Sequence, residues 1–299
     1  MKTIVNIILL SISLSSCLGV SSSNSEALVD FNLNKSDFSK ENQKQFSDYW
    51  YNGTAELTAY ELSQARYGEI HEGKAVLIFV TEQFLPKKQV KADQSSPENI
   101  TVLKLNSTKK YLTGIYPYSV MGSVFTPIDK NDHAIKATFS SQEWCGQTYI
   151  QLNNRKKFEV NSHSYFEGNG DDKFKIKKSY LENDIWTNIR MDPKSLPLGS
   201  LKMIPSLEFF GMNHQQVKVF QVNATLVEKD SLNYYQLSYP ELNRVLIIKF
   251  EKIFPFAIEG WEETYKKQTT TATRIKSIRS DYWNKNSVKD TVLRKELGL

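Results

Sequence analysis

The sequence predicts an all-β protein: an antiparallel open barrel or curved-sheet sandwich, with one N-terminal helix and one short helix between two halves. Short segments with apolar residues at every second position recur along the chain at roughly eight-to-twelve-residue spacing, which is typical of antiparallel strands. Helical patterns do not alternate with these segments, and this disfavours a parallel α/β fold. The chain has 299 residues, of which 40% are hydrophobic and 24% charged, so it can bury a large core.

The first element of the body is a helix expected over residues 36–51. Ser36 is a candidate N-cap, and Asn52-Gly53 provides a stop signal at the other end. One stripe along the helix is aromatic and consists of Phe38, Phe46, Tyr49 and Trp50. This stripe predicts that the helix packs against the sheet.

Strands are expected to follow through the first half of the body. Residues 55–60 alternate between apolar and polar, whereas residues 75–80 are continuously apolar, which predicts a strand covered on both faces. Residues 86–97 are polar and begin and end with proline, so we expect a loop there. Further strands are expected at about 100–106, 114–126, 134–144, 147–153 and 157–167, with turns at Asn153-Asn154 and at 169–172.

The second half repeats this pattern after a short helix expected over residues 179–190. Prolines and a glycine within residues 192–200 break the helix and mark a candidate boundary between the two halves. Strands are then expected at about 217–226, 234–237, 245–250, 254–261 and 271–278. We predict that residues 36–299 form a single all-β domain.

The first sixteen residues are laid out as an export signal. A positively charged start is followed by an apolar run from Ile4 to Leu14, which is too short to span a bilayer. The stretch Leu14-Ser15-Ser16-Cys17 resembles a bacterial lipobox. This resemblance implies cleavage before Cys17, lipidation of that residue, including a fatty acyl chain such as palmitate, and a flexible tether over the rest of residues 17–35. The alternative is an ordinary signal peptide with a chance cysteine.

The signal predicts a lipoprotein of the bacterial cell envelope whose partner is a membrane, reached through the lipid anchor. Each buried acyl CH₂ contributes about 0.8 kcal/mol, and stable attachment takes two chains or more. Because no acidic run follows Cys17, we expect the outer membrane and its periplasmic face. The net charge of +5 is mild and its bases are scattered, so we expect no nucleic-acid partner.

One stretch, from Ser141 to Tyr149, has the composition of a candidate catalytic site. A thiolate nucleophile needs a base within hydrogen-bond reach and a third group to orient that base. Cys145, His163 and Glu143 would supply these parts if their strands pair. The favoured alternative is a core cysteine beside a packing tryptophan, because spacing alone does not establish the geometry. The four histidines lack the close pairing of metal ligands, and we expect neither a metal nor a cofactor.

Four stretches resemble a family of uncharacterised envelope lipoproteins from Bacteroidota. These are Tyr49 to Glu56, Gln64 to Ile70, Gln142 to Gly146 and Ser164 to Gly168. Members of this family are sometimes labelled as Maf septum-formation inhibitors. The true Maf proteins are cytoplasmic α/β nucleotide pyrophosphatases with an N-terminal Ser-Pro-Arg-Arg signature, which this chain lacks. The resembling family has no established activity, so the resemblance assigns no functional residue.

Two functions from different classes remain open. The first is a lipid-anchored envelope protein that binds a hydrophobic small molecule or acts as a structural component that contacts another envelope protein. The alternative is an envelope hydrolase with Cys145 as its nucleophile. The chain contains three aromatic pairs: Phe209-Phe210, Tyr234-Tyr235 and Phe254/Phe256. We expect these pairs to pack in the core. The alternative is that they line an apolar cavity.

Overall fold

A computed structural model describes residues 40–129 and 133–299 of the chain. The described residues belong to one compact unit, which begins at Ser36. The expected signal peptide, Cys17, the tether, Ser36 and Phe38 lie outside the described residues. In the described part of the chain, no helix combines the length and the apolar character that crossing a bilayer requires.

The strands of the first half alternate along the chain with short turns. They are β1 (Ala55–Arg66), β2 (Glu69–Leu85), β3 (Val90–Lys91), β4 (Ile100–Thr113), β5 (Tyr116–Pro127), β6 (Lys136–Glu143), β7 (Gly146–Asn154), β8 (Phe158–Ser164) and β9 (Asp172–Ile176). Most are longer than expected, because the residues at their ends are polar on the solvent side and the apolar alternation is lost there. Asn153 and Asn154 end β7, so the turn begins two residues later than predicted, at 155–157.

The strands of the second half begin at other residues than the sequence indicates. They are β10 (Tyr180–Leu181), β11 (Gly199–Ile204), β12 (Phe220–Lys229), β13 (Leu232–Tyr239), β14 (Arg244–Glu251), β15 (Ile258–Tyr265) and β16 (Gln268–Ser280). Of these, β13, β14 and β16 begin one to three residues earlier than the sequence indicates, whereas β12 and β15 begin three and four residues later. The sequence analysis did not predict β11, because it begins inside the segment rich in proline and glycine. It also missed β9, a strand at the edge of the sheet whose Lys173 and Lys175 are exposed.

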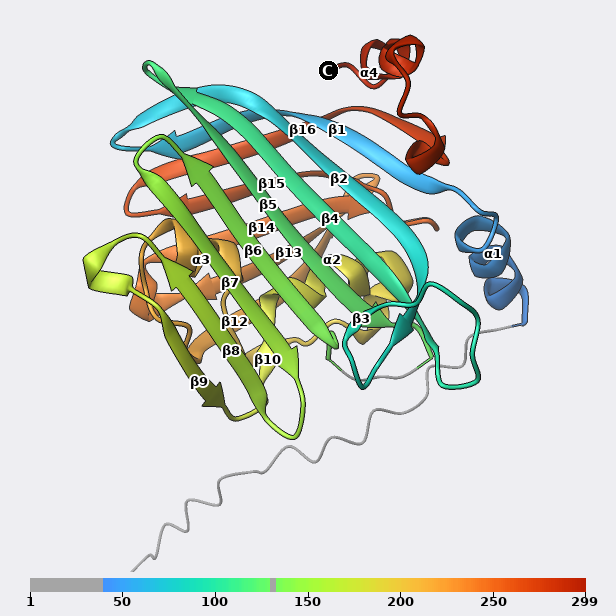
Figure 1. The fold of residues 1–299 in the computed structure, drawn as a ribbon, viewed down its shortest axis with the longest axis horizontal. Helices are drawn as coiled ribbons and strands as arrows, with labels where there is room; N and C mark the ends of the chain where they lie inside the picture. Colours follow the sequence, from blue (N-terminus) through green and yellow to red (C-terminus); the bar gives the residue numbers. More distant parts are fainter. Residues whose placement is uncertain (1–39, 130–132) are drawn as a thin grey trace, which may run out of the picture. The chain divides into compact units, whose positions relative to one another are not determined.

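Together these strands form one curved sheet that does not close (Figure 1). Its order is β10-β11-β12-β13-β14-β15-β16-β1-β2-β4-β5-β6-β7-β8-β9, and β3 pairs with β2 off this path. Neighbouring strands are antiparallel except β10 and β11. Because β16 pairs with β1, the opening falls between the consecutive strands β9 and β10. The predicted all-β fold with an open antiparallel sheet is confirmed.

Four α-helices accompany the sheet in the described ranges: α1 (Lys40–Trp50), α2 (Glu182–Met191), α3 (Leu207–Met212) and α4 (Val292–Glu296). The two predicted helices, α1 and α2, are confirmed, although α2 begins later than expected because Tyr180 and Leu181 form β10. The sequence did not predict α3 and α4, since five or six residues are too few to show a helical period. Short 3₁₀ helices occupy Glu167–Asn169, Pro193–Ser195, Pro240–Leu242, Tyr282–Asn284 and Val288–Thr291.

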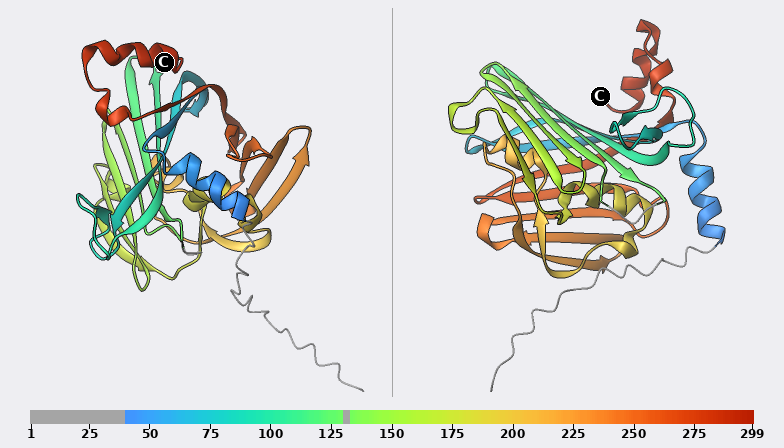
Figure 2. Two further views of the ribbon diagram at one scale, coloured as in Figure 1. Left: turned by 90° about the vertical axis from the view of Figure 1, so that its right-hand side faces the viewer. Right: turned by 60° about the horizontal axis from the view of Figure 1, so that its bottom comes forward.

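The main core lies on the concave side of the sheet, where α2 and α3 pack between the strands of the two halves (Figure 2). Ile185 and Ile189 of α2 and Phe210 of α3 are buried in this core. Gly211 allows α3 to contact β6, because a Cβ at this position would lie 2.1 Å from Cε1 of Phe139. The interior of the open sheet is therefore filled by two helices.

A second, smaller core lies on the other face of β1 and β2. It buries Ala59, Val76 and Leu297, and the partly buried residues packed against it include Ile78 and Ile278. Because Ala75, Leu77 and Phe79 belong to the main core, β2 is covered on both faces. The prediction that residues 75–80 form a strand with two buried faces is confirmed.

Candidate functional site

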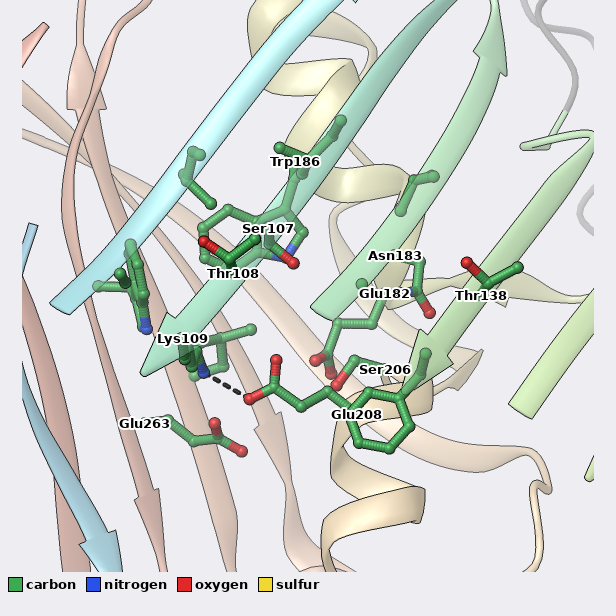
Figure 3. A pocket seen from close by; sticks show the side chains of 18 of the residues that line it. Ser107, Thr108, Lys109, Thr138, Glu182, Asn183, Trp186, Ser206, Glu208 and Glu263 are labelled. Atoms are coloured by element: carbon green, nitrogen blue, oxygen red, sulfur yellow. Dashed lines mark hydrogen bonds and ion pairs between the residues drawn. The ribbon is translucent and has the colours of Figure 1, made fainter. Parts of the chain in front are cut away.

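One cavity among the described residues lies inside the curved sheet, between its concave face and helices α2 and α3. Its volume is about 60 Å³. In Figure 3, Lys109 of β4 points toward Glu208 of α3, and Glu182, Asn183 and Ser206 lie across the cavity. The Nζ atom of Lys109 lies 2.5 Å from Oε1 of Glu208. This ion pair joins α3 to the sheet.

Arg244 of β14 makes a second buried ion pair at the same cavity. Its guanidinium donates to both carboxylate oxygens of Glu182 in α2, at 2.5 and 2.7 Å, and to Glu263 of β15 at 2.6 Å. Burial opposes the charge of Glu263, but Arg244 and Lys109 outweigh this effect and lower the pKa of that carboxyl. Each carboxylate of the cavity is thus paired with Arg244 or Lys109.

A third buried ion pair, outside the cavity, joins α2 to β1. Nη1 and Nη2 of Arg190 donate to Glu56 at 2.5 and 2.7 Å, and Nε donates to the carbonyl oxygen of Pro255 at 2.8 Å. The guanidinium also lies over the rings of Trp50 and Phe79, at 5.1 and 4.7 Å from their centroids. These contacts hold α2 in place rather than offering groups to a ligand.

The interior of the sheet is too small for a hydrophobic ligand in this conformation. A volume of about 60 Å³ holds on the order of two water molecules, whereas ligand sites usually measure roughly 300–1,000 Å³. The aromatic pairs considered as a cavity lining mostly serve packing: Phe209, Phe210 and Tyr235 are buried in the main core, and Phe254 packs against α1 through Tyr49. Their interpretation as core residues is confirmed for Phe209, Phe210 and Tyr235, while Phe254 and Phe256 are partly buried against the core.

A larger cavity, the rim pocket, has a volume of about 330 Å³ and lies at the end of the sheet where several turns meet. Residues 66 and 67 reach it from the β1–β2 turn, Tyr118 from β5, and residues 141–148 from the β6–β7 hairpin. Phe166 follows β8, and residues 211–214 belong to the end of α3 and the segment after it. These elements lie side by side because the antiparallel register brings alternate turns to one end of the sheet.

Arg66, the last residue of β1, is the cation of the rim pocket. Nη1 donates to the carbonyl oxygen of Met212 at 2.7 Å, and Nη2 lies 3.4 Å from the hydroxyl of Tyr118. Tyr67 and Tyr118 share a hydrogen bond of 2.6 Å, and the guanidinium lies 4.6 and 5.4 Å from their ring centroids. Burial opposes the charge, but the neighbouring tyrosines outweigh it and raise the pKa of Arg66, so the group stays cationic.

Cys145 and Glu143 meet at the β6–β7 hairpin in the wall of the rim pocket. The backbone N–H of Cys145 donates to Oε2 of Glu143 at 2.6 Å. The hydrogen bond to Glu143, followed by partial desolvation and the negative charge of that carboxylate, raises the pKa of the Cys145 thiol. A nucleophilic cysteine instead needs a lowered pKa. Cys145 is exposed and forms no disulfide with a described residue, so the expectation of a core cysteine is wrong.

The structure does not bring His163 to Cys145. Nδ1 of His163 lies 3.3 Å from Asp171, and its ring stacks on Tyr149 at 6.5 Å, both in exposed positions. The alternation of β8 turns His163 away from the concave face, which carries the buried Ser162. The predicted arrangement of Cys145, His163 and Glu143 is therefore not assembled. No group of three or more His, Cys, Asp or Glu side chains among the described residues is placed to hold a metal.

His214 lines the rim pocket, although the sequence analysis assigned it no role. Its ring lies 4.4 Å from that of Phe166, and burial, followed by the charge of Arg66, lowers its pKa. The sequence analysis also missed Arg66, since nothing in the stretch from Gln64 to Ile70 shows which other turns lie beside it. Only the register of the whole sheet reveals that these residues share a pocket.

Large apolar side chains at the same end of the sheet, of which Tyr67 and Phe166 line the rim pocket, form what we call the aromatic collar. Four of its members are exposed and two, Tyr116 and Phe166, are half-buried. The collar consists of Tyr67, Ile115, Tyr116, Trp144, Tyr165 and Phe166. Its members come from the β1–β2, β4–β5 and β6–β7 turns and from the end of β8. Ring contacts connect several of them, with Trp144 and Tyr116 at 6.3 Å and Tyr165 and Phe166 at 5.9 Å. Ile115, Tyr165 and Trp144 are 80%, 76% and 66% exposed, so the collar is open to solvent.

The fold and the pocket define a β-barrel-like protein with an open sheet and a cavity at one end. Among solved structures, the crystal structure of a β-barrel-like protein of domain of unknown function DUF1849 from Brucella abortus is similar to it. That match has a TM-score of 0.45 and 8% sequence identity, and it covers 76% of this chain and 98% of the other. No protein-family model matches the sequence, and comparison with curated proteins finds no match.

Proposed function

We propose that this chain is a lipid-anchored binding protein of the bacterial envelope, and that it holds a hydrophobic small molecule in the rim pocket. The anchor is the lipid on Cys17 that the lipobox implies. The binding function is supported by the volume of the rim pocket, about 330 Å³, which lies within the range of small-molecule sites. The helix-filled interior offers no comparable space.

The aromatic collar is the observation that carries this proposal. Clusters of large apolar side chains in exposed positions often mark a binding site, because soluble proteins rarely expose such clusters otherwise. Here two of them, Tyr67 and Phe166, line the rim pocket itself. Tyrosine and tryptophan also combine apolar area with a polar tip that tolerates water. A ligand in the rim pocket would cover the collar and remove its apolar area from solvent.

Native mass spectrometry of the delipidated protein, purified from its host, tests the proposal. We expect a small hydrophobic adduct on the wild type, and we expect its loss in a Trp144→Ser/Tyr165→Ser double variant. Val288→Ser is the matched control, because Val288 is also an exposed apolar residue but belongs neither to the rim pocket nor to the aromatic collar. Absence of any adduct, together with no binding of an apolar fluorescent probe at the collar, would overturn the proposal.

The reactivity of Cys145 separates binding from catalysis. Because Glu143 raises the pKa of the thiol, most of it is protonated at neutral pH, and alkylation proceeds through the thiolate. We expect iodoacetamide to label the native protein more slowly at pH 7 than a free cysteine in a peptide, and Glu143→Gln to speed the labelling. Rapid labelling of the wild type at pH 7 would instead support a hydrolase with a Cys145 nucleophile.

A further inference from the structure

We propose that Arg66 is a head-group site, and that the ligand of the rim pocket is an amphiphile with a carboxylate or phosphate head. Its anionic oxygens would bind the Arg66 guanidinium, and its apolar part would lie against the aromatic collar. This inference rests on the proposed function and adds the chemical class of the ligand to it. It is carried by the hydrogen bonds of Arg66, by the charges of the pocket and by the position of the collar.

The guanidinium of Arg66 has hydrogen-bonding capacity left over. An arginine carries five N–H donors in a planar fork that matches carboxylate and phosphate oxygens. Two of its nitrogens donate to the described residues, Nη1 to Met212 and Nη2 to Tyr118. Nε is buried and has no partner among the described residues. Nη1 and Nη2 each carry a second N–H beyond the one used in these hydrogen bonds, and a ligand oxygen would accept from those donors.

The contact of Arg66 with Met212 and Tyr118 also fixes the guanidinium at the wall of the rim pocket. The carbonyl oxygen of Met212 holds one end, while the rings of Tyr67 and Tyr118 lie beside the guanidinium plane. An arginine held in this way loses little conformational freedom when a ligand binds. The site is therefore pre-organised for an anion.

The cation of Arg66 is not neutralised by a described carboxylate, since none of the ion pairs of the described residues includes it. The pocket contains one carboxylate, Glu143, which accepts hydrogen bonds from the backbone and the thiol of Cys145. His214 contributes little positive charge at neutral pH, because burial and Arg66 lower its pKa. Arg66 is thus the cation available to a ligand, and a charged head of the opposite sign complements it.

The aromatic collar continues the rim pocket in the direction of solvent. Tyr67 belongs to both features, since it lies over Arg66 and is 60% exposed. Tyr165 lies over Gly146 in the pocket wall, where a Cβ would be 2.8 Å from its ring. A molecule with its head on Arg66 would therefore place its apolar part between exposed rings, which favours an amphiphile over a small polar anion.

Four probes of equal chain length test this inference: dodecanoate, dodecyl phosphate, dodecanol and dodecyltrimethylammonium, each below its micelle concentration. Their affinities are measured by displacement of an apolar fluorescent probe from the mature wild-type protein. We expect the two anions to bind at least tenfold more tightly than dodecanol, since charge-assisted hydrogen bonds contribute differences of about this size. The ratio of the affinities for dodecanoate and dodecyl phosphate shows whether the site prefers a fatty acid or a phosphate-bearing lipid.

Substitution of Arg66 identifies the residue. We expect Arg66→Gln to abolish the difference in affinity between dodecanoate and dodecanol, while Arg66→Lys restores part of that difference. Lys110→Gln, an exposed lysine of β4 that does not line the pocket, serves as the matched control. An equal loss in the Lys110 variant would overturn the inference.

The outcomes separate this inference from the proposed function. If none of the four probes binds, hydrophobic binding itself is refuted. If all four bind with equal affinity, or the cation binds most tightly, hydrophobic binding stands and the Arg66 head-group site is overturned. Circular dichroism shows whether Arg66→Gln is folded. If it is not, the affinities of the wild type for the four probes decide whether the pocket prefers an anionic head.

Discussion

Glu56 shows how a single charged residue is stabilised inside this sheet. Its side chain is almost completely buried, and it accepts two hydrogen bonds from Arg190 and one from the hydroxyl of Tyr49. Burial alone would raise the pKa of Glu56, but Arg190 and Tyr49 outweigh burial and lower it to about 2. Removing one partner of such a pair leaves an uncompensated buried charge.

We predict that Glu56→Gln destabilises the protein by about 3–5 kcal/mol at pH 7, with a smaller loss in acid. A lowered pKa in the folded state means that the stabilisation is present above pH 4.5 and is lost as the pH falls toward 2. Urea unfolding of both proteins at pH 7, 4 and 3 measures the difference.

Glu61→Gln provides the control for this pH dependence, because Glu61 pairs with Lys74 on the surface. Exposed pairs contribute roughly 0–1 kcal/mol, so this variant should unfold almost as the wild type does. A difference between wild type and Glu56→Gln that stays constant from pH 7 to pH 3 would contradict the role assigned to the Glu56 carboxylate.

The candidate site was only partly predictable at this scale. The sequence singles out Cys145 and Glu143, and the structure does place them together, because two residues of one hairpin are neighbours in any register. The sequence could not exclude His163 from the candidate site, because a shift of one residue in strand register moves every side chain of the strand to the opposite face. Arg66 and His214 are 148 residues apart in the sequence and meet only because the whole sheet curves around α3.

Among the elements, β2 and α4 depend on each other. The outer face of β2 carries Val76 and Ile78, and Leu297 at the end of α4 covers it. Without this cover, the apolar residues of a strand in the middle of the sheet would face water. The continuous apolar run at 75–80 therefore reports the presence of a second layer, even though the sequence of α4 is too short to be recognised as its source.

We predict that Leu297→Ala lowers the free energy of unfolding by about 2 kcal/mol, at the low end for a buried leucine because the outer core is small. Val292→Ala, on the exposed side of α4, should change it by less than about 0.5 kcal/mol. Thermal and urea unfolding give both values. Equal effects of the two substitutions would show that α4 does not pack on the sheet in solution.

At the scale of the molecule, the sequence predicts the class of fold, and the structure shows where the sheet stays open. Period-two patterning indicates strands, and their number is enough for a barrel or a sandwich. Whether the sheet closes depends on the pairing of β16 with β1 and on the missing pair between β9 and β10, which are properties of strands far apart in the sequence. The sequence also could not predict that α2 and α3 fill the interior, because this depends on contacts between segments that are far apart in the chain.

The expected anchor is also a property of the whole molecule, and Cys17 lies outside the described residues. We predict that the wild type incorporates radiolabelled palmitate and fractionates with membranes, and that Cys17→Ala does neither, because the acyl chains alone hold the protein at the bilayer. Cys145→Ala controls for loss of a thiol and should behave as the wild type. Lipid anchoring would be refuted if the wild type took up no label and Cys17→Ala fractionated with membranes just as the wild type does.

The two edges of the open sheet have a consequence for the behaviour of the protein at high concentration. One edge, β10, is two residues long, and the other, β9, presents Lys173 and Lys175. Long, uncharged edges recruit strands from neighbouring molecules, whereas short or lysine-bearing edges resist such recruitment. Crowded copies of this protein should therefore stay separate, even though the sheet of each copy is open.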